Sequence, residues 1–160
     1  MVDAELRPLG VDDSGLLRVA TLGNMNWCGE RFTMHDVVTR REFAHYCAID
    51  PARGDFGFVA ERAGVAVGVC WAQCLPLDDA GYGFVGAGIP ELSLWVSPAV
   101  RGQGLGRQLL EVVVAEGRRR GFSQVSLSVE AENHAKSLYR SVGFTDVAGR
   151  EADGVMLLRL

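Results

Sequence analysis

The sequence predicts an α/β (α+β) fold with a mixed, mostly antiparallel central sheet that contains one parallel pair of strands. Two observations support this prediction. Apolar residues alternate over residues 56–62 and 65–75 on either side of the Ala63-Gly64 turn, which is typical of an antiparallel hairpin. Strand patterns at 91–96 and 124–129 enclose a glycine turn and a helical pattern. A strand, a crossover helix and a strand form a parallel pair.

The N-terminal elements follow from local patterns. Weak alternation over residues 4–9 predicts a first strand. A helix is expected from a cap at residues 12–14 up to Gly23, where its apolar face ends. Residues 24–31 lose that pattern and predict a loop, and residues 34–46 are expected to form a second helix.

The C-terminal half is predicted in the same way. Residues 76–90 are rich in glycine, aspartate and proline, which indicates a long loop. Asn133 is expected to cap a short helix that Gly143 ends in the left-handed conformation. Residues 144–147 and 155–160 predict a closing antiparallel hairpin.

Strand 91–96 is expected to present two different faces, because successive side chains of a strand point to opposite sides. One face is apolar and the other is polar or aromatic. The apolar face carries Leu92, Leu94 and Val96, and the other face carries Glu91, Ser93 and Trp95.

Three glycines alternate after this strand, at Gly102, Gly104 and Gly106, and a helical pattern begins at once. The first N–H groups of a helix lack partners and carry the positive end of its dipole, so anions bind there. Arg101 and Arg107 add positive charge on either side of the turn. The stretch therefore predicts a phosphate site, and a loop that only turns a tight corner is the alternative.

Two common phosphate motifs do not fit this turn. The dinucleotide fingerprint requires glycine where Arg107 stands, and the P-loop requires a lysine that is absent here, since Lys136 is the only lysine. The pattern Arg101-x-x-Gly104-x-Gly106 instead resembles the acyl-coenzyme A site of the GNAT superfamily of N-acetyltransferases.

A second block strengthens that resemblance. The stretch from Asn133 to Phe144 is similar to the GNAT pattern Asn-x-x-Ala-x-x-x-Tyr-x-x-x-Gly-Phe. Tyr139, Gly143 and Phe144 keep the family spacing, whereas Ala135 follows Asn133 by two residues, one fewer than in the pattern.

The resemblance implies acetyl-CoA as co-substrate, with no metal or flavin, and one GNAT domain over residues 1–160. It also implies helices on both faces of the sheet and a parallel strand pair that parts to form the cofactor cleft. A backbone N–H near Val96 would polarise the thioester carbonyl, and Asn133 would bind the pantetheine arm or simply cap its helix. The expected cofactor-binding residues are Val96, Arg101, Gly102, Gln103, Gly104, Leu105, Gly106, Arg107 and Asn133.

Two residues are candidates for the chemistry. Tyr139 resembles the family's general acid, which protonates or hydrogen-bonds the leaving thiolate; a tyrosine that borders the helix core is the structural alternative. Glu91 is the candidate base for the amine, since several GNAT members carry a glutamate base on this strand. A solvated carboxylate at a strand end is the alternative, in which case water, His45 or Asp55 would take the proton.

The acceptor site is expected on the loops. In GNAT-like enzymes the segment between the first two helices commonly forms one wall of this site, although Trp27 could equally anchor the loop to the core. The long loop after residue 75 is expected to flank it. The candidate acceptor contacts are Asn24, Asn26, Trp27, Arg31, Tyr82, Ser93 and Trp95.

The predicted function is transfer of an acetyl or other acyl group from acetyl-CoA to a primary amine of a small molecule, by direct attack in a ternary complex. Acetylation of protein or peptide N-termini and a non-catalytic acyl-CoA sensor are the alternatives. An acyl-cysteine route has no support, because no cysteine lies in the two motif blocks.

Composition excludes several other classes. The chain of 160 residues is 48% hydrophobic and 22% charged, which suits one core. A net charge of −4 indicates no nucleic-acid or membrane partner. The four cysteines lack metal-site spacing, so free thiols and no metal are expected. The first residues show no leader, which predicts a cytoplasmic protein. Dimerisation is common among relatives, and the sequence leaves a homodimer open.

Overall fold

The computed structural model describes residues 3–160 and confirms the predicted α/β fold. Met1 and Val2, the first residues of the stretch that is expected to lack a leader, lie outside the described residues. Within residues 3–160, seven strands form one sheet in the order β1-β2-β3-β4-β5-β7-β6, and its one parallel pair is β4–β5. The strands are β1 (Glu5–Pro8), β2 (Phe56–Arg62), β3 (Val65–Gln73), β4 (Glu91–Val96), β5 (Gln124–Ser128), β6 (Thr145–Asp146) and β7 (Val155–Arg159).

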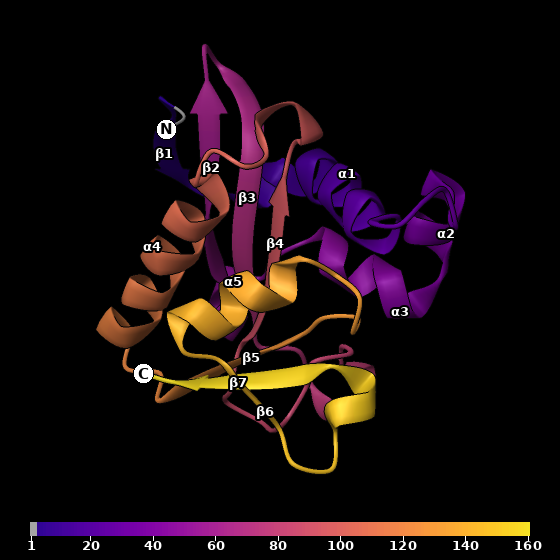
Figure 1. Cartoon of the computed structure of the whole chain (residues 1–160), viewed down its shortest axis with the longest axis vertical. Coiled ribbons are helices and arrows are strands. Elements are labelled where there is room, and N and C mark those ends of the chain that lie inside the picture. Colours follow the sequence, from indigo (N-terminus) through magenta and orange to yellow (C-terminus); the bar gives the residue numbers. More distant parts are fainter. Residues whose placement is uncertain (1–2) are drawn as a thin grey trace.

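Helices lie on both faces of the sheet, and Figure 1 shows α4 on one side of β2 to β4 and α1 on the other. The α-helices are α1 (Ser14–Met25), α2 (Met34–Thr39), α3 (Arg41–Ala44), α4 (Leu105–Arg119) and α5 (Ala135–Val142). A 3₁₀ turn over His45–Cys47 follows α3 directly. No helix among residues 3–160 has the length and apolar character needed to cross a membrane.

The sheet separates two cores, one on each face. The alternation predicted for β4 is confirmed, because Leu92 packs into one core and Trp95 against the other. The larger core, on the α4 and α5 side, includes Leu92, Leu105, Leu109, Val113 and Phe144. The smaller core, on the α1 side, includes Leu17, Ala20, Val59, Val69 and Trp71.

The parallel strands β4 and β5 part after one register pair. Glu91 lies opposite Ser126, and the backbone N–H of Ser126 donates to the Pro90 carbonyl at 2.9 Å. Beyond this point the strands diverge, and in Figure 1 β5 and β7 run crosswise to β2, β3 and β4. The sheet is therefore open along one edge of β4, next to the glycine turn that follows it.

The expected helix over residues 34–46 is interrupted. α2 ends at Thr39, and Arg40 is extended, with φ −80° and ψ 125°. The run Val37-Val38-Thr39 is β-branched and therefore poor at continuing a helix. The Thr39 hydroxyl also donates to the His35 carbonyl at 2.6 Å. This break, together with the 3₁₀ turn, sets the position of Tyr46.

The first helix also differs from its expected bounds. The structure continues α1 to Met25, so Asn24 is helical and not part of a loop. The apolar pattern stops early because the last turn of α1 faces a cavity instead of the core. At the other end, the Asp13 carboxylate accepts from the Gly10 N–H at 2.8 Å and binds Arg7, so it does not cap α1.

Candidate active site

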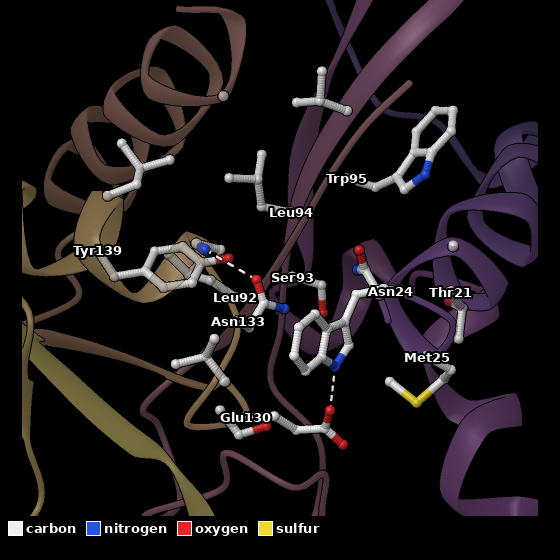
Figure 2. Close-up of a pocket in the computed structure, with 18 of the residues that line it drawn as sticks. Thr21, Asn24, Met25, Leu92, Ser93, Leu94, Trp95, Glu130, Asn133 and Tyr139 are labelled. Carbon is white, nitrogen blue, oxygen red and sulfur yellow. Dashed lines mark hydrogen bonds between the residues drawn. The ribbon is translucent and has the colours of Figure 1, made fainter. Parts of the chain in front are cut away.

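A cavity of about 850 Å³ opens where β4 and β5 part. Figure 2 shows Tyr139 and Asn133 entering it from one side and Thr21, Asn24 and Trp95 from the other. The structure brings together all the candidate site residues except Gln103 and Asn26, which do not line the cavity.

The glycine turn forms one end of this cavity. Gly104 is the N-cap of α4 and has φ +85°, and Gly102 has φ +76°; both values are strained for any residue with a Cβ atom. A Cβ atom built at either position would meet no atom within 4 Å. The first N–H groups of α4 have no side-chain cap, so they are free to bind an anion at this opening.

The two arginines of the turn also make contacts within the protein. The Arg101 side chain donates to the Val96 carbonyl at 3.1 Å, which ties the turn to the end of β4. Arg107 donates to the Ser141 hydroxyl of α5 at 2.5 Å. Both residues still line the cavity, and they supply positive charge beside the free end of α4.

The open edge of β4 presents free backbone groups. Ser97 N–H donates to the Val67 carbonyl at 2.8 Å, on the β3 side. Because the direction of hydrogen bonding alternates along an antiparallel strand, the N–H groups of Leu94 and Val96 point toward the gap. The sequence predicts one free backbone N–H near Val96, and the structure shows a second one at Leu94.

Tyr139 projects from α5 into the cavity and is only 7% exposed. Burial raises the pKa of its phenol, so the hydroxyl is neutral at ordinary pH. The ring packs against Phe144, with the ring centroids 5.9 Å apart. No hydrogen bond to the Tyr139 hydroxyl forms within residues 3–160, which leaves it available to a ligand.

Asn133 lies beside Tyr139 at the start of α5. Its Oδ1 accepts a hydrogen bond from the Ala135 N–H at 2.9 Å, as Figure 2 shows. His134, not Asn133, occupies the N-cap position, so α5 begins one residue later than predicted. The side chain of Asn133 still satisfies the first helical N–H, and Asn133 also lines the cavity.

Glu91 is buried at the other end of β4 and is 4% exposed. The Tyr46 hydroxyl donates to its Oε2 at 2.5 Å, whereas Oε1 has no hydrogen-bond partner among the described residues. Burial raises the pKa of Glu91 to about 7, and the Tyr46 hydrogen bond offsets part of the rise. A carboxylate with this pKa is matched to taking a proton near neutral pH.

The acceptor side of the cavity is bridged at its rim. The Trp27 indole N–H donates to the Glu130 carboxylate, and the Arg31 guanidinium binds the same carboxylate at 3.2 Å. Asn26 is directed elsewhere, because its side-chain amide bonds the backbone of Arg31 and Phe32. Trp27 and Arg31 thus contact the segment that follows β5, and Asn26 holds the loop that carries them.

The alternative proton acceptors lie outside the cavity. Asp55 is 2% exposed and is paired with Arg53, and its oxygens also accept from the backbone N–H groups of Asp50 and Cys74. His45 contacts Asp79 at 3.0 Å. All four cysteines are free, as predicted, and none of them lines the cavity.

Several cavity residues were not predicted from the sequence. Glu130 could have been, because it comes two residues after β5 and side chains at the carboxyl ends of neighbouring parallel strands face one crevice. Tyr46 could not, because nothing in the local sequence links it to Glu91. The other unpredicted lining residues include Thr21, Phe32, Phe43, Leu94 and Leu138.

Comparison with known proteins agrees with this geometry. The model of the acetyltransferase (GNAT) domain family matches residues 53–146. The mycothiol acetyltransferase of Thermobispora bispora is 37% identical over 115 residues, which is 71% of this chain and 36% of that protein. The L-methionine sulfoximine/L-methionine sulfone acetyltransferase of Salmonella typhimurium is 41% identical over 66 residues, 41% of this chain and 39% of that protein. The chain thus spans about a third of the length of these curated relatives.

Solved structures share the fold over nearly the whole chain. The paia N-acetyltransferase of Thermoplasma acidophilum in complex with coenzyme A has a TM-score of 0.70 and 16% identity, with 99% of this chain and 100% of that one covered. A GNAT family acetyltransferase from Brucella melitensis in complex with acetyl-CoA has a TM-score of 0.63 and 18% identity, with 98% and 88% covered.

Proposed function

The chain belongs to the GNAT family of acetyltransferases, and from this premise we propose that it is an acyltransferase that transfers an acetyl group from acetyl-CoA to a primary amine of a small molecule. We assign this activity to residues 1–160 as a single domain, and we assign the attack to the amine itself, within a ternary complex. The observation that carries the proposal is the pair of buried groups, Glu91 and Tyr139, in one cavity beside the glycine turn.

The acyl donor is assigned to the glycine turn and the open edge of β4. The free N–H groups at the start of α4, with Arg101 and Arg107, would bind the pyrophosphate, and Gly102 and Gly104 leave room for its approach. The N–H groups that point into the gap would pair with the pantetheine amides, which is a form of strand addition. A developing negative charge on the thioester oxygen would then lie next to the Val96 N–H.

Tyr139 is assigned to the leaving thiolate. Its hydroxyl is neutral and has no hydrogen bond within the described residues, so it can donate as charge develops on sulfur. The ordinary pKa of a thiol is about 8.5. The pKa of the Tyr139 phenol is higher, because burial raises it above the value of about 10 for free tyrosine. Full transfer of the proton is therefore uphill, and hydrogen bonding to the thiolate is the main contribution expected from Tyr139.

Glu91 is assigned to the amine. An alkyl ammonium has a pKa of about 10.4, so at neutral pH the attacking amine must first lose a proton. The carboxylate of Glu91, with a pKa of about 7, is ionised in a large fraction of molecules at that pH and is more basic than an ordinary glutamate. It would take the proton directly or through a water.

A small acceptor is favoured by the closed rim of the cavity. The Trp27 and Arg31 contacts to Glu130 tie the α1 side to the β5 side at the cavity, and we expect this bridge to hinder the entry of an extended peptide. The relatives named above acetylate small molecules, as their names state. The residues assigned to acceptor contacts are Asn24, Trp27, Arg31, Tyr82, Ser93 and Trp95.

The test is an acetyl-CoA-dependent thiol-release screen over amines, polyamines, amino acids, aminoglycosides and N-terminal peptides. Turnover with small amines and not with peptides is the expected result. Preference for peptides would overturn the assignment of the acceptor class, and coenzyme A binding without any turnover would indicate a sensor.

A further inference from the structure

We propose that Tyr46 is a positioning residue for Glu91: its hydroxyl holds one oxygen of the carboxylate and sets the pH range in which Glu91 accepts a proton. This inference rests on the proposed role of Glu91 as the base. Tyr46 lies in the 3₁₀ turn over His45–Cys47, 45 positions before Glu91, and the two side chains meet in the wall of the cavity.

The direction of the hydrogen bond between the two residues follows from the ionised carboxylate, and a backbone N–H that donates to the Tyr46 oxygen is consistent with it. The backbone N–H of Tyr82 donates to the Tyr46 hydroxyl oxygen at 2.8 Å. An ionised carboxylate can only accept, so the single proton of the Tyr46 hydroxyl points to Glu91 Oε2, 2.5 Å away. A charge-assisted bond of this kind favours the ionised form of Glu91.

Tyr46 is itself held rigidly. It is 5% exposed, and the Trp71 indole N–H donates to its backbone carbonyl at 3.2 Å. The His45 ring packs edge-on against the Tyr46 ring, with the centroids 4.4 Å apart. Burial, and next the nearby Glu91 charge, raise the pKa of Tyr46, so it remains a neutral donor and cannot replace Glu91 as the base.

The loop after β3 closes over the pair. A Cβ atom at Gly81 would come within 2.1 Å of Glu91 Oε1 and 2.5 Å of the Tyr46 hydroxyl, so only glycine lets this loop pass. Three segments that are distant in sequence thus surround one carboxylate. Burying a carboxylate costs free energy. If packing were the only requirement at position 91, an apolar side chain would stabilise the fold more than Glu91 does.

The arrangement explains why Glu91 is buried and yet ionises near neutral pH. Burial alone raises the pKa of Glu91, and the Tyr46 hydrogen bond acts in the opposite direction. Without that bond the pKa would rise further, and less of the enzyme would carry an ionised base at pH 7. Activity would then be recovered only at more alkaline pH.

The experiment compares kcat/KM against pH for the full chain and for Tyr46→Phe, with saturating acetyl-CoA and the best acceptor from the screen. Loss of the hydroxyl should move the midpoint of the acidic limb upward by about one pH unit, with about fivefold lower kcat/KM at pH 7 and recovery toward pH 9. Replacement of Tyr46 by 3-fluorotyrosine keeps the ring and hydroxyl and makes a stronger donor, so it should move the midpoint downward.

Two further measurements separate the possible failures. In the Glu91→Gln background, Tyr46→Phe should produce no additional change in the pH profile, since the group that titrates is gone. If Glu91→Gln is inactive at pH 7 but neither Tyr46 variant moves the midpoint, Tyr46 has only a packing role and the inference is wrong. If Glu91→Gln itself retains the wild-type profile, the assignment of the base fails, and this inference fails with it. The fluorotyrosine protein supplies the test if Tyr46→Phe does not fold.

Discussion

The indole N–H of Trp27 donates a hydrogen bond to the carboxylate of Glu130, which lies 103 positions further along the chain. Arg31 binds the same carboxylate, so the α1 side and the β5 side of the cavity meet at its rim. These groups are partly exposed, and ion pairs of this kind contribute little to stability, typically about 0–1 kcal/mol. Their effect is expected on access to the cavity instead.

Glu130→Ala should therefore change which acceptors are used. Removal of the carboxylate separates Trp27 and Arg31 from the β5 side, so bulkier amines should gain activity relative to small ones, whereas coenzyme A affinity should stay constant. Steady-state kinetics over acceptors of increasing size measure this effect. Glu132→Ala is the matched control, since Glu132 is exposed and does not line the cavity. An unchanged acceptor range in Glu130→Ala would show that the rim does not control access.

Gly104→Asp should abolish binding of coenzyme A. The substitution places a side chain and a negative charge at the N-terminus of α4, where we assign the pyrophosphate, and a loss of affinity of about 100-fold or more is expected. Isothermal titration calorimetry measures the affinity.

The control for backbone strain is Gly121→Asp. Gly121 follows α4 and has φ +87°, close to the +85° of Gly104, and a Cβ atom at either position meets no atom within 4 Å. Both variants carry the same strain and charge, but only Gly104 lines the cavity. Equal loss of coenzyme A affinity in the two variants would count against the anchor at the glycine turn.

Tyr139→Phe should lower kcat by roughly 100-fold with little change in coenzyme A affinity, because it removes a group that acts as the thiolate leaves. Stability should change little, since the hydroxyl has no partner within residues 3–160 and the ring contact with Phe144 remains. Kinetics and thermal unfolding are measured on the same preparation. A large drop in melting temperature at unchanged kcat would assign Tyr139 to the core instead.

The Glu91 carboxylate also predicts a dependence of stability on pH. Its pKa is about 7 in the folded protein and 4.5 in its ordinary state. Between these values the folded state binds more protons than the unfolded state, so the free energy of unfolding falls as pH rises from 4.5 to 7. The contribution of Glu91 to the free energy of unfolding is therefore fully present below about pH 4.5 and is lost above about pH 7.

The side chain in Glu91→Gln cannot ionise, so the variant should not lose unfolding free energy as the pH rises from 4.5 to 7. At about pH 8 the variant should exceed the wild type in unfolding free energy by an amount on the order of 3 kcal/mol, and the gain should shrink steadily toward pH 4.5. Urea unfolding at several pH values measures the difference. A gap that does not vary with pH would mean that Glu91 has an ordinary pKa.

Local patterns predicted the elements whose residues are neighbours in sequence. The β4 strand, the glycine turn and the start of α4 lie within one short stretch, so periodicity and glycine spacing were sufficient to predict them. The turn at Ala63 and Gly64 was predicted for the same reason, and both residues have positive φ.

Features that depend on distant partners were not predicted. Tyr46 and Glu91 are joined only after the break at Arg40 and the packing of the loop at Gly81, and neither event leaves a local pattern. The helical state of Asn24 was missed because the last turn of α1 faces a cavity, so its polar side chains ended the apolar pattern while the helix continued.

Acetyl transfer to a small amine is tested by measuring both products of one reaction. Wild-type protein, acetyl-CoA and the best small amine are incubated, and released coenzyme A and N-acetylated amine are quantified by mass spectrometry. Equal amounts of the two products are expected, with a strong reduction of both in the Glu91→Gln and Tyr139→Phe proteins at neutral pH. Release of coenzyme A without an acetylated amine, or full acetylation by both variants, would contradict the proposed function.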